Sequence, residues 1–269
     1  MGDKMHIAFC TDKHYASYTG VAMTSIILNN LGNAIFFHLF HIGLNEDDKN
    51  KFILIQKMYM NVEIKFYDLS SESRIDSMKI NHYYTKAVYL RWYIAEKIDL
   101  QVKRILYLDG DILCLGDLKE LYYLKLPSDR KYALAAVGKS QTENEIKRLK
   151  LTQPKVINTG VLLIDLFEWR QQKISARLFE YAEKHHDELI WLDNDVMNSV
   201  LDGDFYLIEE KWNHRIYINN MPHFCILPND IIVHYSGKYK PWSHDCNNKN
   251  AFIWWEYVKK SLWNNITKA

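Results

Sequence analysis

Two aspartates separated by one glycine, Asp109-Gly110-Asp111, directly follow the apolar run 104–108. Carboxylates at this spacing could bind a metal ion. In an extended segment, residues two apart point to the same side, so both carboxylates can reach one point. The glycine leaves room for close approach. Two hard oxygen ligands suit Mg²⁺ or Mn²⁺. Because Asp-Gly is also common turn chemistry, the triplet alone leaves a plain turn as an equal alternative.

A second apolar run, residues 231–233, leads into His234, which is followed by Gly237 and Lys240. Glycine lets backbone N–H groups approach a phosphate closely, and lysine adds a point charge. A lone histidine after an apolar run is more often a hydrogen-bonded core residue than a ligand. The glycine and lysine beyond it favour a diphosphate site.

The segments that must position these residues alternate between strand-like and helix-like patterns. We expect strands over 6–10, 35–42, 62–69 and 104–108, and helices over 21–28, 45–60 and 85–98. This order predicts an α/β fold with a single, mostly parallel, twisted sheet flanked by helices, which binds ligands at the carboxyl ends of its strands. The first strand-to-helix turn contains no Gly-x-Gly-x-x-Gly, which disfavours a dinucleotide held by a glycine-rich loop.

The composition fits one large domain: the chain has 269 residues, of which 48% are hydrophobic. We expect one domain over residues 1–248, followed by an aromatic, basic C-terminal helix over 249–269. The net charge is +1 with acidic and basic residues mixed, which disfavours a nucleic-acid partner.

Several sequence features indicate a cytoplasmic protein. The four cysteines form no Cys-x-x-Cys pair, which fits reduced thiols. The N-terminus lacks the apolar core of a signal peptide. No apolar stretch reaches the roughly 20 residues needed to span a bilayer. Peripheral contact with the inner face of the membrane is the alternative to a fully soluble location.

Taken together, the ordered motifs resemble the family 8 retaining glycosyltransferases, such as the bacterial lipooligosaccharide galactosyl- and glucosyltransferases. The resemblance runs from His6 to about Trp242. Besides the two segments above, it includes residues 89–93, 157–165 and 191–198. It implies a GT-A-like fold, with residues 1–248 as a nucleotide-sugar-binding catalytic domain. It also implies the transfer of galactose or glucose from a UDP-sugar to a hydroxyl of a glycan or glycolipid, such as a surface glycan or lipooligosaccharide.

The resemblance also implies a metal site and a nucleotide site. Asp109, Asp111 and His234 are similar to the family's Mn²⁺ ligands, and a histidine ligand favours Mn²⁺ over Mg²⁺, which is the alternative ion. The positions that match nucleoside or diphosphate contacts are Asp12, His14, Gly237 and Lys240.

Three residues match positions that hydrogen-bond the donor sugar, namely Arg91, Asn158 and Asp193. Each has a structural alternative: a surface helix charge for Arg91, turn chemistry before Gly160 for Asn158, and a helix N-cap for Asp193. The candidate catalytic residues are Asp193 and its neighbour Asn194.

Three positions depart from the family's pattern. Asn194 stands where bacterial members commonly have glutamine, which affects positioning at the anomeric carbon. His14 stands where asparagine is common, which affects nucleoside contacts. Gly138-Lys139 replaces the usual acidic residue after the strand 132–137, which affects donor-sugar specificity.

The family transfers with retention of configuration, and two chemical routes are open. An amide is a poor nucleophile, so Asn194 disfavours a covalent intermediate and favours front-face attack by the acceptor; Asp193 is the reserve nucleophile. Two rival functions remain. A metal-dependent sugar-nucleotide hydrolase predicts a second metal cluster, whereas a non-catalytic sugar-nucleotide binder tolerates the loss of metal ligands.

The segment 250–266 has a helical period. One broad apolar face carries Ala251, Trp254, Trp255, Val258 and Leu262. In bacterial relatives a basic, aromatic tail is thought to attach the enzyme to the membrane, and these residue types suit that interface. The alternative is a helix packed on the domain with its tryptophans in the core.

Overall fold

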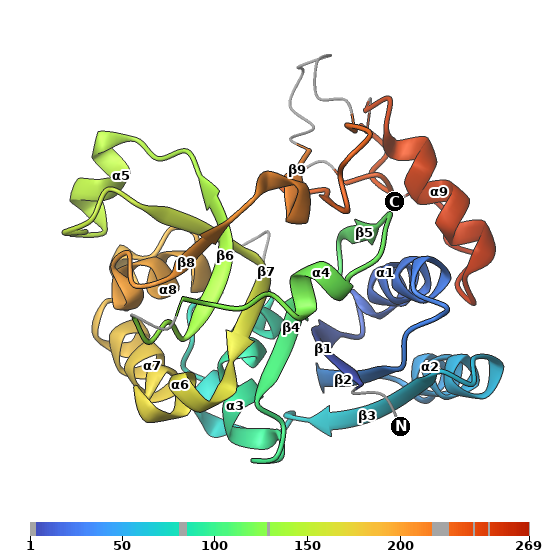
Figure 1. Ribbon diagram of the computed structural model, residues 1–269, viewed down its shortest axis with the longest axis horizontal. Helices are drawn as coiled ribbons and strands as arrows, with labels where there is room; N and C mark the ends of the chain where they lie inside the picture. Colours follow the sequence, from blue (N-terminus) through green and yellow to red (C-terminus); the bar gives the residue numbers. More distant parts are fainter. Residues whose placement is uncertain are drawn as a thin grey trace.

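A seven-stranded sheet in the order β3-β2-β1-β4-β7-β6-β8 forms the centre of the protein (Figure 1). The computed structural model describes residues 4–80, 85–127, 130–216, 226–238, 240–246 and 248–268. The strands of this sheet are β1 (Met5–Asp12), β2 (Ile35–Ile42), β3 (Val62–Asp68), β4 (Arg104–Leu108), β6 (Leu134–Lys139), β7 (Val156–Asp165) and β8 (Tyr206–Ile208).

The strand directions confirm a mostly parallel sheet. β3, β2, β1 and β4 pair in parallel, and so do β6 and β8. Only β7 is reversed among these strands, because it pairs antiparallel with both β4 and β6. The start of β7 therefore lies at the same edge of the sheet as the carboxyl ends of β1 and β4, where ligands bind in such folds.

A second, three-stranded sheet was not predicted from the sequence. It has the order β5-β10-β9 and consists of β5 (Ile112–Cys114), β9 (His214–Arg215) and β10 (Ile232–His234). Strands of two or three residues are too short to show a period of two, so the sequence pattern marked only the apolar run at β10.

Helices cover both faces of the main sheet. The α-helices are α1 (Ala16–Asn29), α2 (Glu46–Met58), α3 (Ile94–Lys97), α4 (Lys119–Tyr122), α5 (Glu143–Arg148), α6 (Leu166–Gln171), α7 (Ile174–Lys184), α8 (Asp193–Leu201) and α9 (Ala251–Lys260). The 3₁₀ helices are η1 (Ser73–Ile75), η2 (Lys86–Tyr93), η3 (His186–Glu188) and η4 (Glu210–Trp212). Figure 1 shows α1, α2 and α9 at one end of the sheet and α5 to α8 at the other.

Local sequence signals explain several boundaries. The Asn45 side chain accepts a hydrogen bond from Asp48 N and caps α2, as expected. The segment expected to be helical over 85–98 is instead a 3₁₀ helix, η2, followed by the single turn α3. Nearly all side chains of η2 are buried, so tertiary packing on several sides decides its backbone rather than one apolar stripe.

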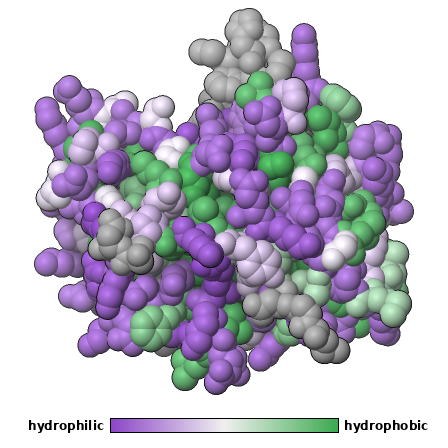
Figure 2. Space-filling model, viewed as in Figure 1, coloured by the Kyte–Doolittle hydropathy of each residue, from purple (hydrophilic) through white to green (hydrophobic). Residues whose placement is uncertain are grey.

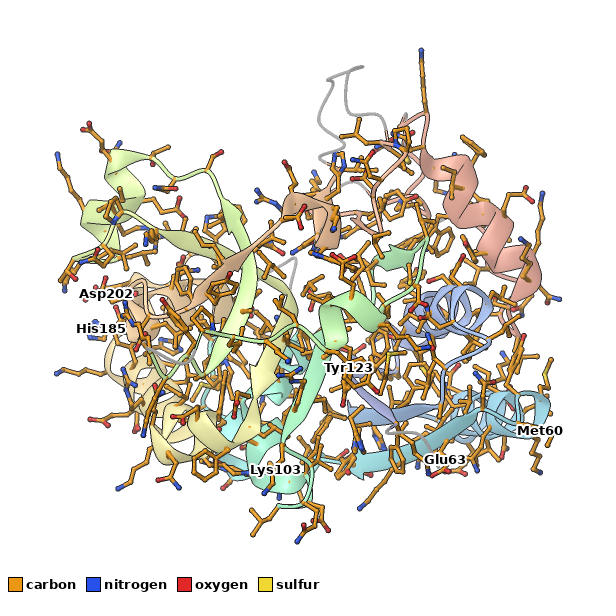
Figure 3. The ribbon with its side chains drawn as sticks, in the orientation of Figure 1. Met60, Glu63, Lys103, Tyr123, His185 and Asp202 are labelled. Atoms are coloured by element: carbon orange, nitrogen blue, oxygen red, sulfur yellow. The ribbon has the colours of Figure 1, made fainter. Side chains whose placement is uncertain are left out.

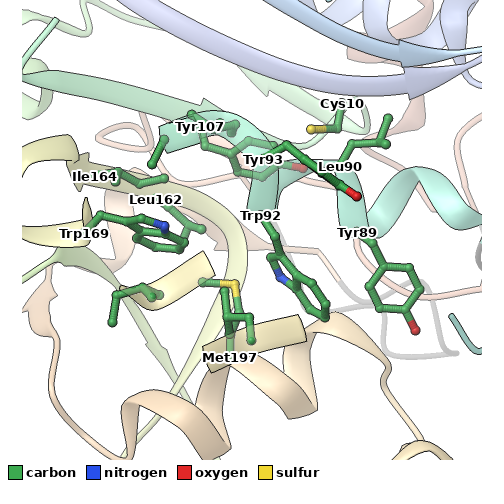
Figure 4. Close-up of a cluster of buried hydrophobic side chains, with 14 of the residues drawn as sticks. Cys10, Tyr89, Leu90, Trp92, Tyr93, Tyr107, Leu162, Ile164, Trp169 and Met197 are labelled. Carbon is green, nitrogen blue, oxygen red and sulfur yellow. The ribbon is translucent and has the colours of Figure 1, made fainter. Parts of the chain in front are cut away.

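The core has a layer on each face of the sheet. On one face, buried aromatic and aliphatic side chains of η2, α6, α7 and α8 pack against β4 and β7. Figure 4 shows part of this cluster, including Tyr89, Trp92, Tyr107, Leu162, Trp169 and Met197. The other face is covered by α1, α2, α4 and Trp263. The two layers hold the sheet edge that carries the candidate site.

The C-terminal helix packs on the domain. Trp254 and Val258 of α9 are buried, and α9 contacts α1. The expected helix over 250–266 ends earlier, at Lys260, after which Trp263 N donates to Ser261 Oγ. The Trp263 ring lies against Gly20, where an added Cβ would be 2.1 Å from it, and its Nε1 donates to Asp48 Oδ1 at 2.9 Å.

Hydrophilic side chains cover most of the face shown in Figure 2, with smaller groups of hydrophobic side chains between them. Met60, just after α2, lies at the outer edge of the molecule and is fully exposed (Figure 3). Within the described residues, no helix is both long enough and apolar enough to cross a membrane. Cys10, Cys114 and Cys246 are free thiols, and Cys225 lies outside the described residues.

Candidate active site

Asp109, Asp111 and His234 meet at the carboxyl edge of the main sheet. One potential ligand atom from each lies within 4.8 Å of the others. His234 Nε2 is 3.3 Å from Asp111 Oδ1 and 3.9 Å from Asp109 Oδ2. The structure therefore brings together the three residues that the sequence indicated as metal ligands, although 123 positions separate Asp111 from His234 in the chain.

The small sheet positions the histidine. β5 begins directly after Asp111, and β10 pairs antiparallel with it, so that His234 lies opposite Ile112. Tyr235 N donates to Asp111 O at 3.0 Å, and Asp109 N donates to Gly160 O at 2.8 Å. Backbone hydrogen bonds thus fix both ends of the Asp-Gly-Asp turn and bring β10 beside it.

The cluster fits a divalent ion by its chemistry and by the space around it. His234 Nδ1 bonds to Asn213 Oδ1 at 2.9 Å, which leaves Nε2 to face the two carboxylates. A Cβ added at Gly160 would lie 2.3 Å from His234 Cε1 and 2.8 Å from Asp109 Oδ2. Glycine at position 160 therefore keeps room beside these ligands. Two carboxylates and one imidazole suit Mn²⁺ or Mg²⁺, and the imidazole favours Mn²⁺.

Arg91 is buried beneath the cluster, which excludes the alternative of a surface helix charge. Its Nη2 donates to Asp109 Oδ1 at 2.9 Å, and its Nη1 is 3.3 Å from Asp193 Oδ2. The same Asp109 oxygen accepts from Tyr107 OH at 2.5 Å. Arg91 therefore links a candidate metal ligand to a candidate sugar-binding residue and balances part of their charge.

Asp193 is the first residue of α8, and its side chain is buried rather than capping the helix. Thr159 Oγ1 donates to its Oδ2 at 3.2 Å. Burial raises the pKa of Asp193 to about 6, although Arg91 opposes this shift. The residue before it, Leu192, has φ of +45°. A non-glycine residue there costs on the order of 1–3 kcal/mol and is a kind of strain found at functional sites.

Asn158 and Asn194 both belong to this edge but differ in how their amides are used. Asn194 Nδ2 donates to Ile157 O at 3.3 Å and to Thr159 Oγ1 at 3.2 Å, so its side chain lies against β7. Asn158 Oδ1 accepts from Gly160 N at 3.0 Å. This bond agrees with the turn-type alternative for Asn158, but Asn158 Nδ2 has no hydrogen-bond partner among the described residues and can serve a ligand.

Lys240 lies directly on the cluster. Its Nζ donates to Asp111 Oδ2 at 2.5 Å and to Tyr235 O at 2.8 Å. Burial by itself raises the pKa of Asp111, but Lys240 and His234 outweigh burial and hold the pKa well below its usual value. Gly237, three residues before Lys240, lies in an exposed turn with φ of +93°, a backbone conformation that favours glycine.

The first strand-to-helix turn places Asp12 and His14 at the same edge. Asp12 Oδ1 accepts from His14 N at 2.8 Å and from Tyr15 N at 3.0 Å, so one carboxylate oxygen shapes the entry to α1. The His14 side chain is exposed. Tyr15 OH donates to Asp111 Oδ2 at 3.4 Å, which ties this turn to the metal ligands.

The Gly138-Lys139 departure lies at the end of β6, where a bulge separates Ala136 from Gly138. Lys139 Nζ forms an ion pair with Glu145 Oε1 at 2.7 Å, and both side chains are mostly buried. The positive charge that replaces the usual acidic residue is therefore neutralised by α5.

Sequence reasoning missed three residues that support the site: Tyr107, Thr159 and Asn213. Tyr107 lies on β4, two residues before Asp109. The period of two in an extended segment points both side chains to the same side, so this spacing could have identified Tyr107. Thr159 lies inside the motif 157–165, but the sequence pattern assigned no function to it. Asn213 had no such signal, because it belongs to no strand or helix and reaches the site through hydrogen bonds to residues far away in the sequence.

Comparison of the sequence with models of known protein families identifies the family of this chain. The model described as "Glycosyl transferase family 8" matches residues 6–246. The chain belongs to glycosyltransferase family 8. Among its relatives, General stress protein A of Bacillus subtilis is 27% identical over 97% of this chain and 96% of that protein. Lipopolysaccharide 1,3-galactosyltransferase of Salmonella typhimurium is 30% identical over 89% of this chain and 73% of its own length.

The fold comparison agrees. The crystal structure of galactosyltransferase LgtC in complex with donor and acceptor sugar analogs matches with a TM-score of 0.82 and 23% identity, covering 96% of each chain. This likeness confirms the GT-A fold of this family 8 glycosyltransferase.

Proposed function

We propose that this family 8 glycosyltransferase transfers galactose or glucose from a UDP-sugar to a hydroxyl of a glycan or glycolipid acceptor, with retention of configuration. Asp109, Asp111 and His234 would hold Mn²⁺, with Mg²⁺ as the alternative. The convergence of these three residues beside Lys240 carries the proposal, because it combines cation ligands with a positive charge suited to a diphosphate.

The chemical problem is to break the bond between the anomeric carbon and a β-phosphate oxygen. A bound divalent ion supplies Lewis-acid stabilisation of the departing diphosphate, worth several kcal/mol. Lys240 adds a charge-assisted hydrogen bond to the diphosphate when it releases Asp111 Oδ2, its partner in this structure. Gly237 leaves the backbone of the same turn open to a phosphate.

The donor sugar would lie over Asn158 and Asp193. Asn158 offers Nδ2 to a hydroxyl, and Asp193, held by Arg91 and Thr159, accepts from another. The Asn194 side chain is committed to β7. Both its position and its amide chemistry make it a poor nucleophile, which supports front-face attack in which a phosphate oxygen takes the acceptor proton. Asp193 remains the reserve nucleophile.

Donor choice is the test of this proposal. UDP-galactose or UDP-glucose should bind with Mn²⁺ present, and Asp12→Asn and Lys240→Met should each weaken binding about tenfold or more through a lost charged hydrogen bond. Calorimetry against a panel of nucleotide sugars measures this, with Asp68→Asn as the control because Asp68 ends β3 outside the cluster. Tighter binding of guanosine or adenosine diphosphate sugars would refute the uridine assignment.

The same assay separates the rival functions. UDP release that requires an acceptor supports a transferase, and release that needs only water supports a hydrolase. Binding without release supports a non-catalytic binder. Asp109, Asp111 and His234 form the sole candidate metal cluster within the described residues, so the second ion that many metal-dependent hydrolases use has no comparable set of ligands in this part of the chain.

The name of the Salmonella typhimurium relative, a lipopolysaccharide 1,3-galactosyltransferase, supports a glycolipid acceptor. Membrane contact through α9 stays a prediction, but the tryptophans of its apolar face are packed on the domain. α9 leaves Phe252, Glu256, Lys259 and Lys260 exposed, and Lys259 Nζ forms an ion pair with Glu256 Oε1 at 2.6 Å. We expect weak, salt-sensitive binding to anionic vesicles, because each lysine near such a surface contributes about 1 kcal/mol.

Vesicle sedimentation measures this prediction. Truncation after Asn248 is a poor test, since it removes the buried Trp254 and Trp263 and would destabilise the domain. The combined change Lys259→Glu and Lys260→Glu should abolish vesicle binding and leave the fold intact. Equal sedimentation of the two proteins with anionic vesicles would show that α9 is purely structural.

A further inference from the structure

Asn213 connects the metal ligands to the donor-sugar residues and is completely buried. It lies between η4 and β9, with its backbone N donating to Glu210 O at 2.9 Å. Both ends of its carboxamide are used. Oδ1 is 2.9 Å from His234 Nδ1, and Nδ2 donates to Asn158 Oδ1 at 2.8 Å. One side chain thus bridges the small sheet to β7 of the main sheet.

The direction of these hydrogen bonds follows from a backbone group that can only donate. Gly160 N–H donates to Asn158, so the atom of Asn158 that it faces must be the oxygen. The atom of Asn213 that faces this same oxygen must then be its nitrogen. The opposite end of Asn213, its Oδ1, faces His234 and accepts from Nδ1–H.

The consequence for His234 is a defined tautomer. A neutral imidazole with its proton on Nδ1 has a lone pair on Nε2, the atom that faces Asp109 and Asp111. Had the amide of Asn213 been turned over, Nδ1 would carry the lone pair and Nε2 a hydrogen. The histidine would then donate to the carboxylates rather than bind a cation beside them.

We propose that Asn158 and Asn213 form a hydrogen-bond relay that sets the tautomer and ring orientation of His234 as a metal ligand. The relay rests on the proposed function, because it concerns the metal site of that reaction. It makes Asn213 a positioning residue and gives Asn158 a second role besides contact with the donor sugar. Partners of this kind usually change metal affinity by about 10- to 100-fold when they are removed.

The test measures Mn²⁺ binding to the full-length, metal-free protein by electron paramagnetic resonance, without any nucleotide. Asn213→Leu removes the acceptor for Nδ1–H and should weaken Mn²⁺ binding about 10- to 100-fold. Asn213→Asp restores an acceptor and should stay within roughly threefold of the unchanged protein, since a carboxylate is an ordinary partner of a ligating histidine. Asn158→Leu should weaken binding about tenfold, although it contacts no proposed ligand atom directly.

Asn33→Leu is the matched control. Asn33 is also a buried asparagine whose amide donates to two side chains, Asn30 and Asp117, and it contacts none of the proposed ligands. It should lower thermal stability as much as Asn213→Leu does while leaving Mn²⁺ affinity unchanged. If Asn213→Leu binds Mn²⁺ as tightly as the control, or if Asn158→Leu has no effect, the relay is overturned.

The relay and the proposed function fail separately. Loss of Mn²⁺ affinity in the relay variants of a protein that transfers no hexose would refute the function and keep the relay. Normal UDP-hexose transfer with unchanged Mn²⁺ affinity in Asn213→Leu would support the function and refute the relay. No Mn²⁺ binding by the unchanged protein would overturn the relay as a device for a metal ligand.

Discussion

Replacing Asp109 or Asp111 by asparagine is expected to reduce hexose transfer roughly a thousand-fold or more, since Lewis-acid stabilisation is worth several kcal/mol and each 1.4 kcal/mol is a factor of ten. Asparagine is preferred to alanine at position 109. It keeps an acceptor for Arg91 and Tyr107, which share Asp109 Oδ1, while it replaces the oxygen nearer to His234. His234→Ala should have the mildest effect of the three, because both carboxylates remain.

The measurement is the initial rate of transfer at saturating donor and Mn²⁺, together with direct Mn²⁺ binding. Asp68→Asn is again the control, because this carboxylate ends another parallel strand of the same sheet without joining the cluster. It should retain full activity. Turnover within tenfold of normal for either site variant, or undiminished activity of the unchanged protein in excess chelator, would show that the metal assignment is wrong.

Asp193→Asn should stabilise the fold at neutral pH while it reduces transfer about a hundred-fold or more, in the range that loss of one transition-state contact costs. The stabilising effect comes from burial, which raises the pKa of Asp193 to about 6 against the opposing effect of Arg91. Asparagine retains an oxygen for Thr159 but carries no charge. The activity loss reflects the missing contact with the donor sugar.

The pH dependence of the gain has a definite sign. A carboxyl whose pKa is higher in the folded state binds more protons there, so its contribution to the free energy of unfolding falls as pH rises from about 4 to about 6. Asp193→Asn has no carboxyl to ionise at this position, so its free energy of unfolding does not fall for this reason. Its advantage should be near zero at pH 4, grow through that window, and level off above it at about 1–3 kcal/mol, since one pKa unit is about 1.4 kcal/mol.

Denaturant unfolding of both proteins in metal-free buffer across pH 4–8 measures this difference. Chelator is essential, because a cation at Asp109 would change the charge that Asp193 experiences. A variant less stable than the unchanged protein at pH 7 would mean that the ion pair between Asp193 and Arg91 is net stabilising, and that burial does not dominate at this position.

The sequence by itself determined the features that depend on neighbouring residues. Alternating apolar segments predicted strands β1 to β4 and helices α1 and α2 within the first 108 residues, and β2 (Ile35–Ile42) and β4 (Arg104–Leu108) have the expected bounds. The parallel topology then placed Asp12 and Asp109 at one edge, because carboxyl ends of parallel strands share an edge. The ordered motifs carried the family, which the match over residues 6–246 confirms.

Only the tertiary structure decided which side chains support the site. The sequence leaves Arg91 open between a donor-sugar contact and a surface helix charge, whereas the structure buries it between Asp109 and Asp193. Asn213 is 55 positions from Asn158 and 21 from His234, and it joins them through a small sheet whose strands are too short to be recognised. The tryptophans of α9 fit a membrane or a core equally well in sequence. In the structure Trp254 packs on Tyr18 of α1, and Trp255 Nε1 donates to Pro241 O.

The physical reason is the range of the interactions. Backbone conformation and helix caps depend on residues within a few positions, so a continuous pattern records them. Burial of a charge and the orientation of an amide depend on groups that folding brings together from distant parts of the chain. The tautomer of His234 depends on the backbone N–H of Gly160 acting through two asparagines, and no local pattern contains that information.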